Sequence, residues 1–341
     1  MRNSMLAFVL WLLWGTAAHA AAAPISVDLA LDTYARPGRL VDIGNGRRMN
    51  LRCSGRGAPT VILDSGLSES SLAWHKVQPS LATSTRVCAY DRAGLGFSDA
   101  GPLPRTARAE MDDLHALVQA AGIRPPLVLV GHSLGSYIAR LYANVHPVEV
   151  AAVVVVDLPN GDFDAFEPEV ARLFARMNHD DLESGPYRRC LQAAKAGALA
   201  RRQPEHAACF AQPAAPPRSS KRLRDSLRAM VSKPAFWAAI VSEKEAWPAA
   251  TPAALKATHR SYGAMPLTIL ASDGSNAYLP PDLRKAADAA WAASYRRLAM
   301  DSTRSTIIEV AHSSHYINDD RPDAIVDAVV QLIGQLRTSA H

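Results

Sequence analysis

The sequence predicts an α/β protein with a mostly parallel central sheet. Short apolar runs rich in β-branched residues occur at 60–63, 127–130 and 151–156, and longer segments with helical patterning separate them. Strands that are apolar on both faces are typical of a parallel sheet covered by helices on either side. Two alternating runs joined by Asn-Gly at 45–46 predict a hairpin at the start of the sheet. A Gly-x-Ser-x-Gly at 131–135 links one buried run directly to a helix.

The first residues have the composition of an export signal. Arg2 precedes an apolar run at 5–14, and Ala-His-Ala at 18–20 fits a cleavage site. The run is too short to cross a bilayer, which requires about 20 apolar residues. We therefore expect a signal peptide at 1–20 and a loosely held leader at 21–38. The protein is expected to be secreted or periplasmic, with no stable membrane span after the signal is removed.

Charge is unevenly distributed along the chain. The net charge is +5, and residues 159–262 alone carry sixteen Lys and Arg against eleven Asp and Glu. Residues 188–233 hold eleven basic residues and two acidic ones, Glu205 and Asp225. This segment is either a solvated helical surface or a surface that attracts an anionic substrate or a membrane. The charge is too dilute for a nucleic-acid interface, and aromatic residues are not interleaved with it.

The remaining patterns place strands and helices in alternation along the chain. The hairpin strands are expected at 39–43 and 47–54. Later strands are expected at 60–63, 86–90, 127–130, 151–156, 266–271 and 305–310, and helices at 110–122, 137–146, 281–300 and 322–336. The Gly-rich segment at 91–98 lacks the helix and the Gly-Lys-Ser of a phosphate-binding loop, so we interpret it as a structural turn.

Ser133 is the candidate nucleophile. A serine at the tip of a strained strand-to-helix turn needs neighbours without Cβ atoms, and Gly131 and Gly135 provide them. The hydroxyl is then exposed to a substrate. The N–H groups at the start of the following helix face any negative charge that develops there.

With a strand before the pentapeptide and a helix after it, the chain resembles the α/β-hydrolase superfamily. The segment at 91–98 is similar to the Asp-Arg-x-Gly-x-Gly-x-Ser loop of that superfamily. The resemblance implies an α/β-hydrolase fold, in which an eight-stranded, mostly parallel sheet has helices on both faces. It places the core at 39–158 and 263–341, and a helical lid at 159–262, inserted after the sixth strand.

The resemblance also implies the other members of a catalytic triad. In the superfamily a histidine follows the last strand, and His315 matches this position better than His312, which lies closer to the strand end. Asp157 follows the sixth strand and Asp273 follows the seventh, so each is a candidate for the acid. Most relatives have the acid after the seventh strand, but Asp273 lies about two positions early. Asp157 is therefore preferred, and Asp273 stays the alternative.

The loop after the third strand is implied to provide half of the oxyanion hole. Many relatives have His-Gly there, and this chain has Ser-Gly at 65–66, which retains backbone donation. We expect the N–H groups of Leu67 and Leu134 as donors, with Ser68 as an alternative to Leu67. Trp74 either lines the substrate site or fills the core.

Export makes the four cysteines candidates for disulfides. The resemblance makes the second and fourth strands neighbours, and so predicts a bridge between Cys53 and Cys88. Cys190 and Cys209 both lie in the insert and are predicted to join a helical hairpin. The alternative is that all four are small buried hydrophobic residues.

These residues predict a serine hydrolase. Dehalogenases and epoxide hydrolases of the superfamily have Asp at the elbow, whereas this chain has Ser133. We expect it to cleave a carboxylic ester, or a related acyl bond of a small molecule, through an acyl-enzyme intermediate. The alternatives are a prolyl-type aminopeptidase on the same triad and a non-catalytic binding protein of this fold. No His or Cys cluster has metal-ligand spacing, so no metal or cofactor is expected, and the oligomeric state is left open.

Overall fold

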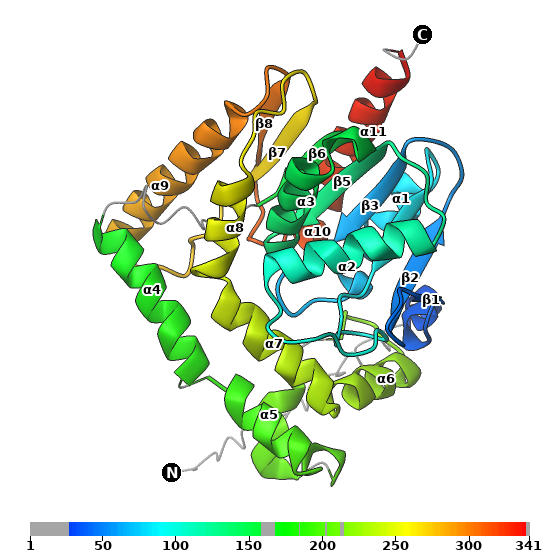
Figure 1. Ribbon diagram of the computed structural model, residues 1–341. Coiled ribbons are helices and arrows are strands. Elements are labelled where there is room, and N and C mark those ends of the chain that lie inside the picture. Colours follow the sequence, from blue (N-terminus) through cyan, green and yellow to red (C-terminus); the bar gives the residue numbers. More distant parts are fainter. Residues whose placement is uncertain (1–26, 158–167, 184, 202, 212–214, 339–341) are drawn as a thin grey trace, which may run out of the picture.

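The computed structural model describes residues 27–157, 168–183, 185–201, 203–211 and 215–338. The predicted signal peptide at 1–20 lies outside these ranges. Figure 1 shows a central sheet with helices packed on it, and a further group of helices that extends away from the sheet. Among the described residues, no helix combines the length and the apolar character that crossing a membrane would require.

The central sheet has eight strands, in the spatial order β1-β2-β4-β3-β5-β6-β7-β8. The strands are β1 (Arg39–Asp42), β2 (Arg48–Ser54), β3 (Thr60–Asp64), β4 (Val87–Tyr90), β5 (Leu127–His132), β6 (Val150–Val156), β7 (Leu267–Ser272) and β8 (Ser305–Val310). β2 pairs antiparallel with β1 and β4, and every other pair is parallel. The predicted eight-stranded, mostly parallel sheet is therefore confirmed.

Helices cover both faces of this sheet (Figure 1). The core helices are α1 (Gln78–Leu81), α2 (Ala107–Ala120), α3 (Leu134–Val145), α9 (Pro281–Ala299), α10 (Ile317–Asp320) and α11 (Pro322–Thr338). One apolar cluster joins α2, α3 and α9 to one face, and a second joins α1, α10 and α11 to the other. In β5, Leu127 and Leu129 belong to the first cluster, and Val128 and Val130 to the second, as the alternation of a strand requires. Each such buried side chain contributes about 1.5–3 kcal/mol.

The chain between β6 and β7 forms a helical insert. Its helices are α4 (Pro168–Glu183), α5 (Tyr187–Lys195), α6 (Lys221–Val231), α7 (Pro234–Ala246) and α8 (Ala250–Thr258). α5 and α7 share a separate apolar core, which includes Trp237 and also Leu95 from the predicted turn at 91–98. α8 packs instead on the main core through Leu255. By its packing, α8 belongs with the sheet core. The insert therefore ends before α8, and not at residue 262 as predicted.

The leader is not loosely held where the structure describes it. A short 3-10 helix, η1 (Leu29–Ala35), has Asp28 as its N-cap residue, whose side chain accepts the N–H of Ala30 at 3.0 Å. Leu31 is buried and packs with Leu223 and Leu227 of α6. The expectation of a loose leader is wrong for this segment, because burial of Leu31 and the hydrogen bond from the Asp28 N–H to the Arg218 carbonyl at 2.9 Å attach it to the insert.

Both predicted disulfides are present. Cys53 and Cys88 lie directly opposite each other in the antiparallel pair of β2 and β4. Cys190 of α5 is bonded to Cys209 in a short 3-10 helix, η6 (Pro204–Phe210). The two bridges therefore tie the antiparallel edge to the parallel sheet and cross-link the insert within itself.

Two helices begin earlier than their apolar periodicity predicts. α3 begins directly after the predicted elbow rather than at residue 137, and α2 begins at residue 107 rather than 110. The start of α2 is fixed by Thr106, whose hydroxyl accepts the N–H of Ala109 at 3.2 Å. Capping, rather than periodicity, determines this helix start.

Candidate active site

Ser133 lies at a sharp turn between β5 and α3. Its φ of 52° is in the region that non-glycine residues avoid, as a strained elbow requires. A Cβ on Gly131 would lie 2.3 Å from the backbone of Gly135, and a Cβ on Gly135 would lie 2.3 Å from the carbonyl oxygen of Asp64. Both positions therefore require glycine. The N–H of Ser133 donates to the carbonyl of Val156 at 3.0 Å, which ties the turn to β6.

The structure brings Asp157 and His315 together. Asp157 follows β6 and is fully buried, and its Oδ2 lies 2.6 Å from Nδ1 of His315. The Tyr295 hydroxyl donates to Oδ1 at 2.8 Å, the Ser275 hydroxyl donates to Oδ2, and the Ser272 N–H donates to Oδ1 at 3.3 Å. These donors replace the water that the carboxylate loses on burial. A carboxylate on Nδ1 selects the tautomer in which Nε2 can accept a proton.

Asp273 has a different set of partners. Its Oδ2 accepts the N–H of His312 at 3.0 Å, and its Oδ1 accepts the N–H of Ser313 at 3.1 Å. These two backbone hydrogen bonds lower the pKa of Asp273. The Asp273 carboxylate therefore stabilises the loop that carries His315, whereas the imidazole of His315 is bound by Asp157.

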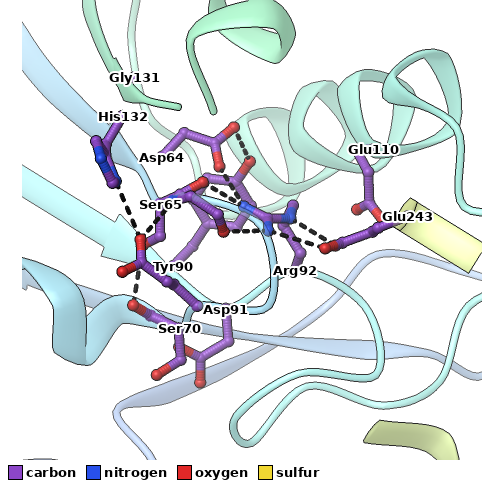
Figure 2. A network of polar contacts seen from close by, with 12 residues as sticks. Asp64, Ser65, Ser70, Tyr90, Asp91, Arg92, Glu110, Gly131, His132 and Glu243 are labelled. Atoms are coloured by element: carbon purple, nitrogen blue, oxygen red, sulfur yellow. Dashed lines mark hydrogen bonds and ion pairs between the residues drawn. The ribbon is translucent and has the colours of Figure 1, made fainter. Parts of the chain in front are cut away.

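The loop after β3 is held by the buried side chain of Arg92, which uses all five of its N–H groups (Figure 2). Nη1 donates to the Asp64 carboxylate at 3.0 Å and to the Ser65 carbonyl at 2.6 Å. Nη2 donates to the Gly66 carbonyl at 2.6 Å. Nε and Nη2 also bind the two carboxylate oxygens of Glu243 in α7, at 2.9 and 3.3 Å. Arg92 thus connects this loop to the insert.

The same contacts distinguish Leu67 from Ser68. Because a peptide unit is planar and trans, the carbonyl of Gly66 and the N–H of Leu67 point in opposite directions. By holding that carbonyl, Arg92 fixes the direction of the Leu67 N–H. The N–H of Ser68 donates to Oε2 of Glu243 at 3.1 Å. No acceptor among the described residues lies against the Leu67 N–H, so Leu67 rather than Ser68 retains a donor for a ligand.

His132, directly before Ser133, joins two loops of the site. Its Nε2 lies 2.9 Å from the carbonyl oxygen of His315, and its Nδ1 lies 3.1 Å from Oε2 of Glu69. Burial lowers the pKa of His132, but the hydrogen bond and the charge of Glu69 raise it by more, so the net pKa is raised. Figure 2 shows His132 at the end of β5, on the far side of Asp64 from Glu243.

A cavity of about 250 Å³ lies beside Ser133 and His315. Most of its other lining side chains are apolar or aromatic. They come from the loop after β3, the start of α3, the insert and the loop that carries His315: Leu67, Ser68, Leu134, Tyr187, Phe236, Ile240, Lys244, Trp247 and Tyr316. Lys244 is the one lysine or arginine among the described lining residues, and its Nζ lies 4.4 Å from the centre of the Tyr187 ring. The predicted nucleophile, base and both oxyanion donors therefore line a single cavity.

The fold of the chain matches a known protein family. A family model for the alpha/beta hydrolase fold matches residues 59–251, which is more than half of the chain. The chain belongs to the α/β-hydrolase family. A haloalkane dehalogenase of Mycolicibacterium smegmatis is 32% identical over 137 residues, which are 38% of this α/β hydrolase and 43% of the dehalogenase. The curated relatives that the chain matches are covered over less than half of their length.

Solved structures share the fold of this α/β hydrolase over most of its length. A loop variant of the haloalkane dehalogenase DbeA from Bradyrhizobium elkanii aligns with a TM-score of 0.65 and 20% identity, over 88% of this chain and 97% of that chain. A thermophilic esterase from Thermogutta terrifontis with bound malate aligns with a TM-score of 0.56 and 19% identity, over 88% and 99% of the two chains. At these identities the likeness establishes the fold alone.

Trp74 does not line the cavity of this α/β hydrolase. Its side chain is completely buried and packs in the same apolar cluster as Leu81 and Ile317, on the face covered by α1 and α11. The assignment of Trp74 to the substrate site is therefore wrong, because the segment after β3 turns this indole into the core. Tyr187 and Trp247 of the insert provide aromatic walls instead.

Several residues of the site were not singled out from the sequence. The pattern at 91–98 predicts only a structural turn, although an arginine two positions after an apolar strand is itself a signal of a buried ion pair. Glu243 lies 151 positions from Arg92, and Tyr295 lies 138 positions from Asp157. No local pattern predicts contacts at these separations.

Among the described residues, one group could offer several ligands to a metal ion: His115, His146 and Glu149. The two rings are stacked 3.9 Å apart and only 8° from parallel. Nitrogen lone pairs lie in the ring planes, so stacked rings cannot direct them at one ion unless a ring turns. None of these residues lines the cavity beside Ser133.

Proposed function

We propose that this α/β hydrolase cleaves a carboxylic ester, or a related acyl bond of a small molecule, through an acyl-enzyme intermediate. Ser133 attacks the carbonyl carbon, His315 takes the hydroxyl proton and passes it to the leaving group, and Asp157 holds the imidazole. Water then releases the acyl group by the same proton transfers. The observation that carries the proposal is the 2.6 Å contact between Asp157 and His315, beside a cavity that His315 and Ser133 both line.

The oxyanion formed in the attack would be bound by the N–H groups of Leu67 and Leu134. The first is directed by Arg92 through the Gly66 carbonyl, and the second lies at the start of α3, where N–H groups have no partner within the helix. A preorganised donor of this kind stabilises the transition state by about 3–4 kcal/mol.

A serine at the elbow supports acyl transfer over the chemistry named for the dehalogenase relatives. In the superfamily, dehalogenases and epoxide hydrolases use an aspartate at this position. The hydroxyl of Ser133 instead forms an ester when it attacks an acyl substrate, and water can cleave that ester. Lys244 argues against the aminopeptidase alternative, because a cation in the lining repels the ammonium group of a peptide substrate. The buried carboxylate on His315 supports an enzyme over a non-catalytic binding protein, because burial of an acid is costly and a binding protein does not require it.

We also propose that the protein is exported, as a secreted or periplasmic enzyme. Two disulfides are typical of proteins from oxidising compartments. Together with the signal peptide predicted at 1–20, they support export, and the Ala-His-Ala pattern at 18–20 predicts cleavage after Ala20. N-terminal sequencing of the exported protein tests this assignment.

The catalytic proposal is tested with a fluorophosphonate probe, which reacts with an activated serine. We expect labelling of the wild type and none of Ser133→Ala or His315→Ala. Ser302→Ala is the matched control, because this buried serine donates to the Met265 carbonyl at 2.6 Å and does not line the cavity. Turnover of p-nitrophenyl esters of increasing length, compared with anilide analogues, then separates esterase from amidase activity. Labelling that persists in Ser133→Ala would reject the proposal.

A further inference from the structure

Both ring nitrogens of His132 face oxygen atoms that act as hydrogen-bond acceptors. Nε2 lies 2.9 Å from the carbonyl oxygen of His315, and Nδ1 lies 3.1 Å from Oε2 of Glu69. The same Oε2 accepts the N–H of Gly66 at 2.7 Å. A carbonyl oxygen has no proton to donate, and the hydroxyl oxygen of a carboxylic acid is a poor acceptor for the Gly66 N–H. Both contacts therefore require a proton on the His132 nitrogen.

A neutral imidazole has a proton on only one nitrogen. In that form, one of the two contacts would direct a bare nitrogen lone pair at an oxygen lone pair inside a buried site, which is unfavourable. We infer that His132 is an imidazolium ion paired with ionised Glu69, and that it is a positioning residue. It holds the loop that carries His315 (residues 311–316) against the loop after β3 (residues 65–70), which we call the oxyanion loop. The positioning role rests on the proposed function, whereas the charge state of the pair does not.

The charged and titratable groups around His132 come from three elements. Glu69 belongs to the oxyanion loop, and Asp157 lies at the end of β6. From the loop before α10, the ring centres of His315 and Tyr316 lie 4.8 and 5.8 Å away. The two carboxylates favour the cation. Burial opposes ionisation of Glu69, but the hydrogen bond and the charge of His132 outweigh it, and the pKa of Glu69 is lowered.

The pair gives the site a pH dependence of known sign. The pKa of His132 is raised in the folded protein, so the stabilisation from its charge is fully present below the unfolded value of about 6.5. It is lost as the pH rises through the folded value, because one of the two contacts then loses its proton. His315 has to be neutral to accept a proton from Ser133, whereas the positioning role requires a charged His132. The activity should therefore fall on the alkaline side when His132 loses its charge.

Nuclear magnetic resonance of protein labelled with ¹⁵N in its histidines tests the charge state directly. The His132 signals are assigned by their absence from His132→Gln. We expect both nitrogens to be protonated at pH 7 in the wild type, and one of them to lose its proton at lower pH in Glu69→Gln than in the wild type. A neutral His132 at pH 7 in the wild type would overturn the inference. This measurement does not depend on turnover, so it can fail or succeed separately from the proposed function.

Profiles of kcat/KM against pH with p-nitrophenyl acetate test the positioning role. We expect Glu69→Gln to move the alkaline limb to lower pH, and His132→Gln to lower kcat and remove that limb. The control is Glu149→Gln, since Glu149 contacts His115 at 3.3 Å in a second His–Glu pair away from the cavity, and its profile should match the wild type. A purely structural role would lower activity equally at every pH. An alkaline limb that stays in place in Glu69→Gln would overturn the assignment.

Discussion

Asp157 and Asp273 each follow a strand of the sheet, but their oxygens have different partners. Asp157 has a φ of 44°, an unfavourable backbone conformation, and its carboxylate is bound to an imidazole. Asp273 binds two backbone N–H groups of the loop that carries His315. A strained residue at a site is consistent with a constraint on the direction of its side chain, which is what an acid that orients His315 needs.

Replacement by asparagine should therefore have different effects on kcat at the two positions. Asp157→Asn is expected to lower kcat by about 10⁴, because an amide can support the wrong imidazole tautomer. Asp273→Asn retains one acceptor oxygen, so we expect a loss of stability of about 1 kcal/mol and less than a tenfold change in kcat. Steady-state kinetics and thermal unfolding of both variants measure these effects. A larger loss of kcat in Asp273→Asn would exchange the two roles.

Arg92 offers a second test at the level of single residues. A lysine has three donors and no planar fork, so Arg92→Lys cannot hold the Ser65 and Gly66 carbonyls together with Glu243. We expect kcat to fall by about 10- to 100-fold, with a smaller change in KM, because misdirection of the Leu67 N–H affects the transition state more than the ground state.

The matched control for Arg92→Lys is Arg105→Lys. Arg105 is also buried, and its guanidinium is paired with Glu110 and Asp113, but it does not touch the oxyanion loop. Unfolding experiments should show a similar loss of stability in both variants, whereas the loss of kcat is expected only in Arg92→Lys. Equal kinetics in the two variants would show that Arg92 has no role beyond stability.

At the level of elements, η1 is the segment whose packing has the clearest consequence. Leu31 packs with Leu223 and Leu227 of α6, so the leader stabilises one helix of the insert. Leu31→Ala removes a buried side chain and should lower the free energy of unfolding by about 2–5 kcal/mol. We expect α6 to become more sensitive to limited proteolysis, because it loses its cover. Exposed Leu29 is the control position, where alanine should have little effect.

The sequence was informative where local chemistry decides the structure. The strands were predicted because a buried parallel strand must be apolar on both faces, and the elbow because only glycine fits at positions 131 and 135. It was uninformative where the position of a side chain depends on segments that are distant in the sequence. Trp74 is as apolar in a pocket wall as in a core, and nothing near Arg92 in the sequence indicates that Glu243 binds it. The alternatives for the acid had the same origin, since Asp157 and Asp273 both follow apolar strands and differ only in their tertiary partners.

In the molecule as a whole, the disulfides stabilise two different regions. The Cys190–Cys209 bridge closes a loop with a sequence separation of 19 inside the insert, which corresponds to about 3 kcal/mol in the chain-entropy estimate. Replacing both cysteines with serine should therefore loosen the insert while the sheet stays folded. Hydrogen exchange measured by mass spectrometry is expected to accelerate in α5 and α7 and to stay slow in β5. Loss of protection in β5 to the same extent would show that the two regions unfold together.

The contact between Glu243 and the oxyanion loop has a practical consequence for protein engineering. An insert transplanted from another α/β hydrolase would have to supply a carboxylate at the position of Glu243, because Ser68 and Arg92 both bind it. Without that acid, a chimera would contain Ser133, His315 and Asp157 intact and still lack a well-directed N–H at Leu67. Changes of substrate preference in this scaffold are therefore best sought by varying α5 and the rest of α7 while residue 243 is kept as glutamate.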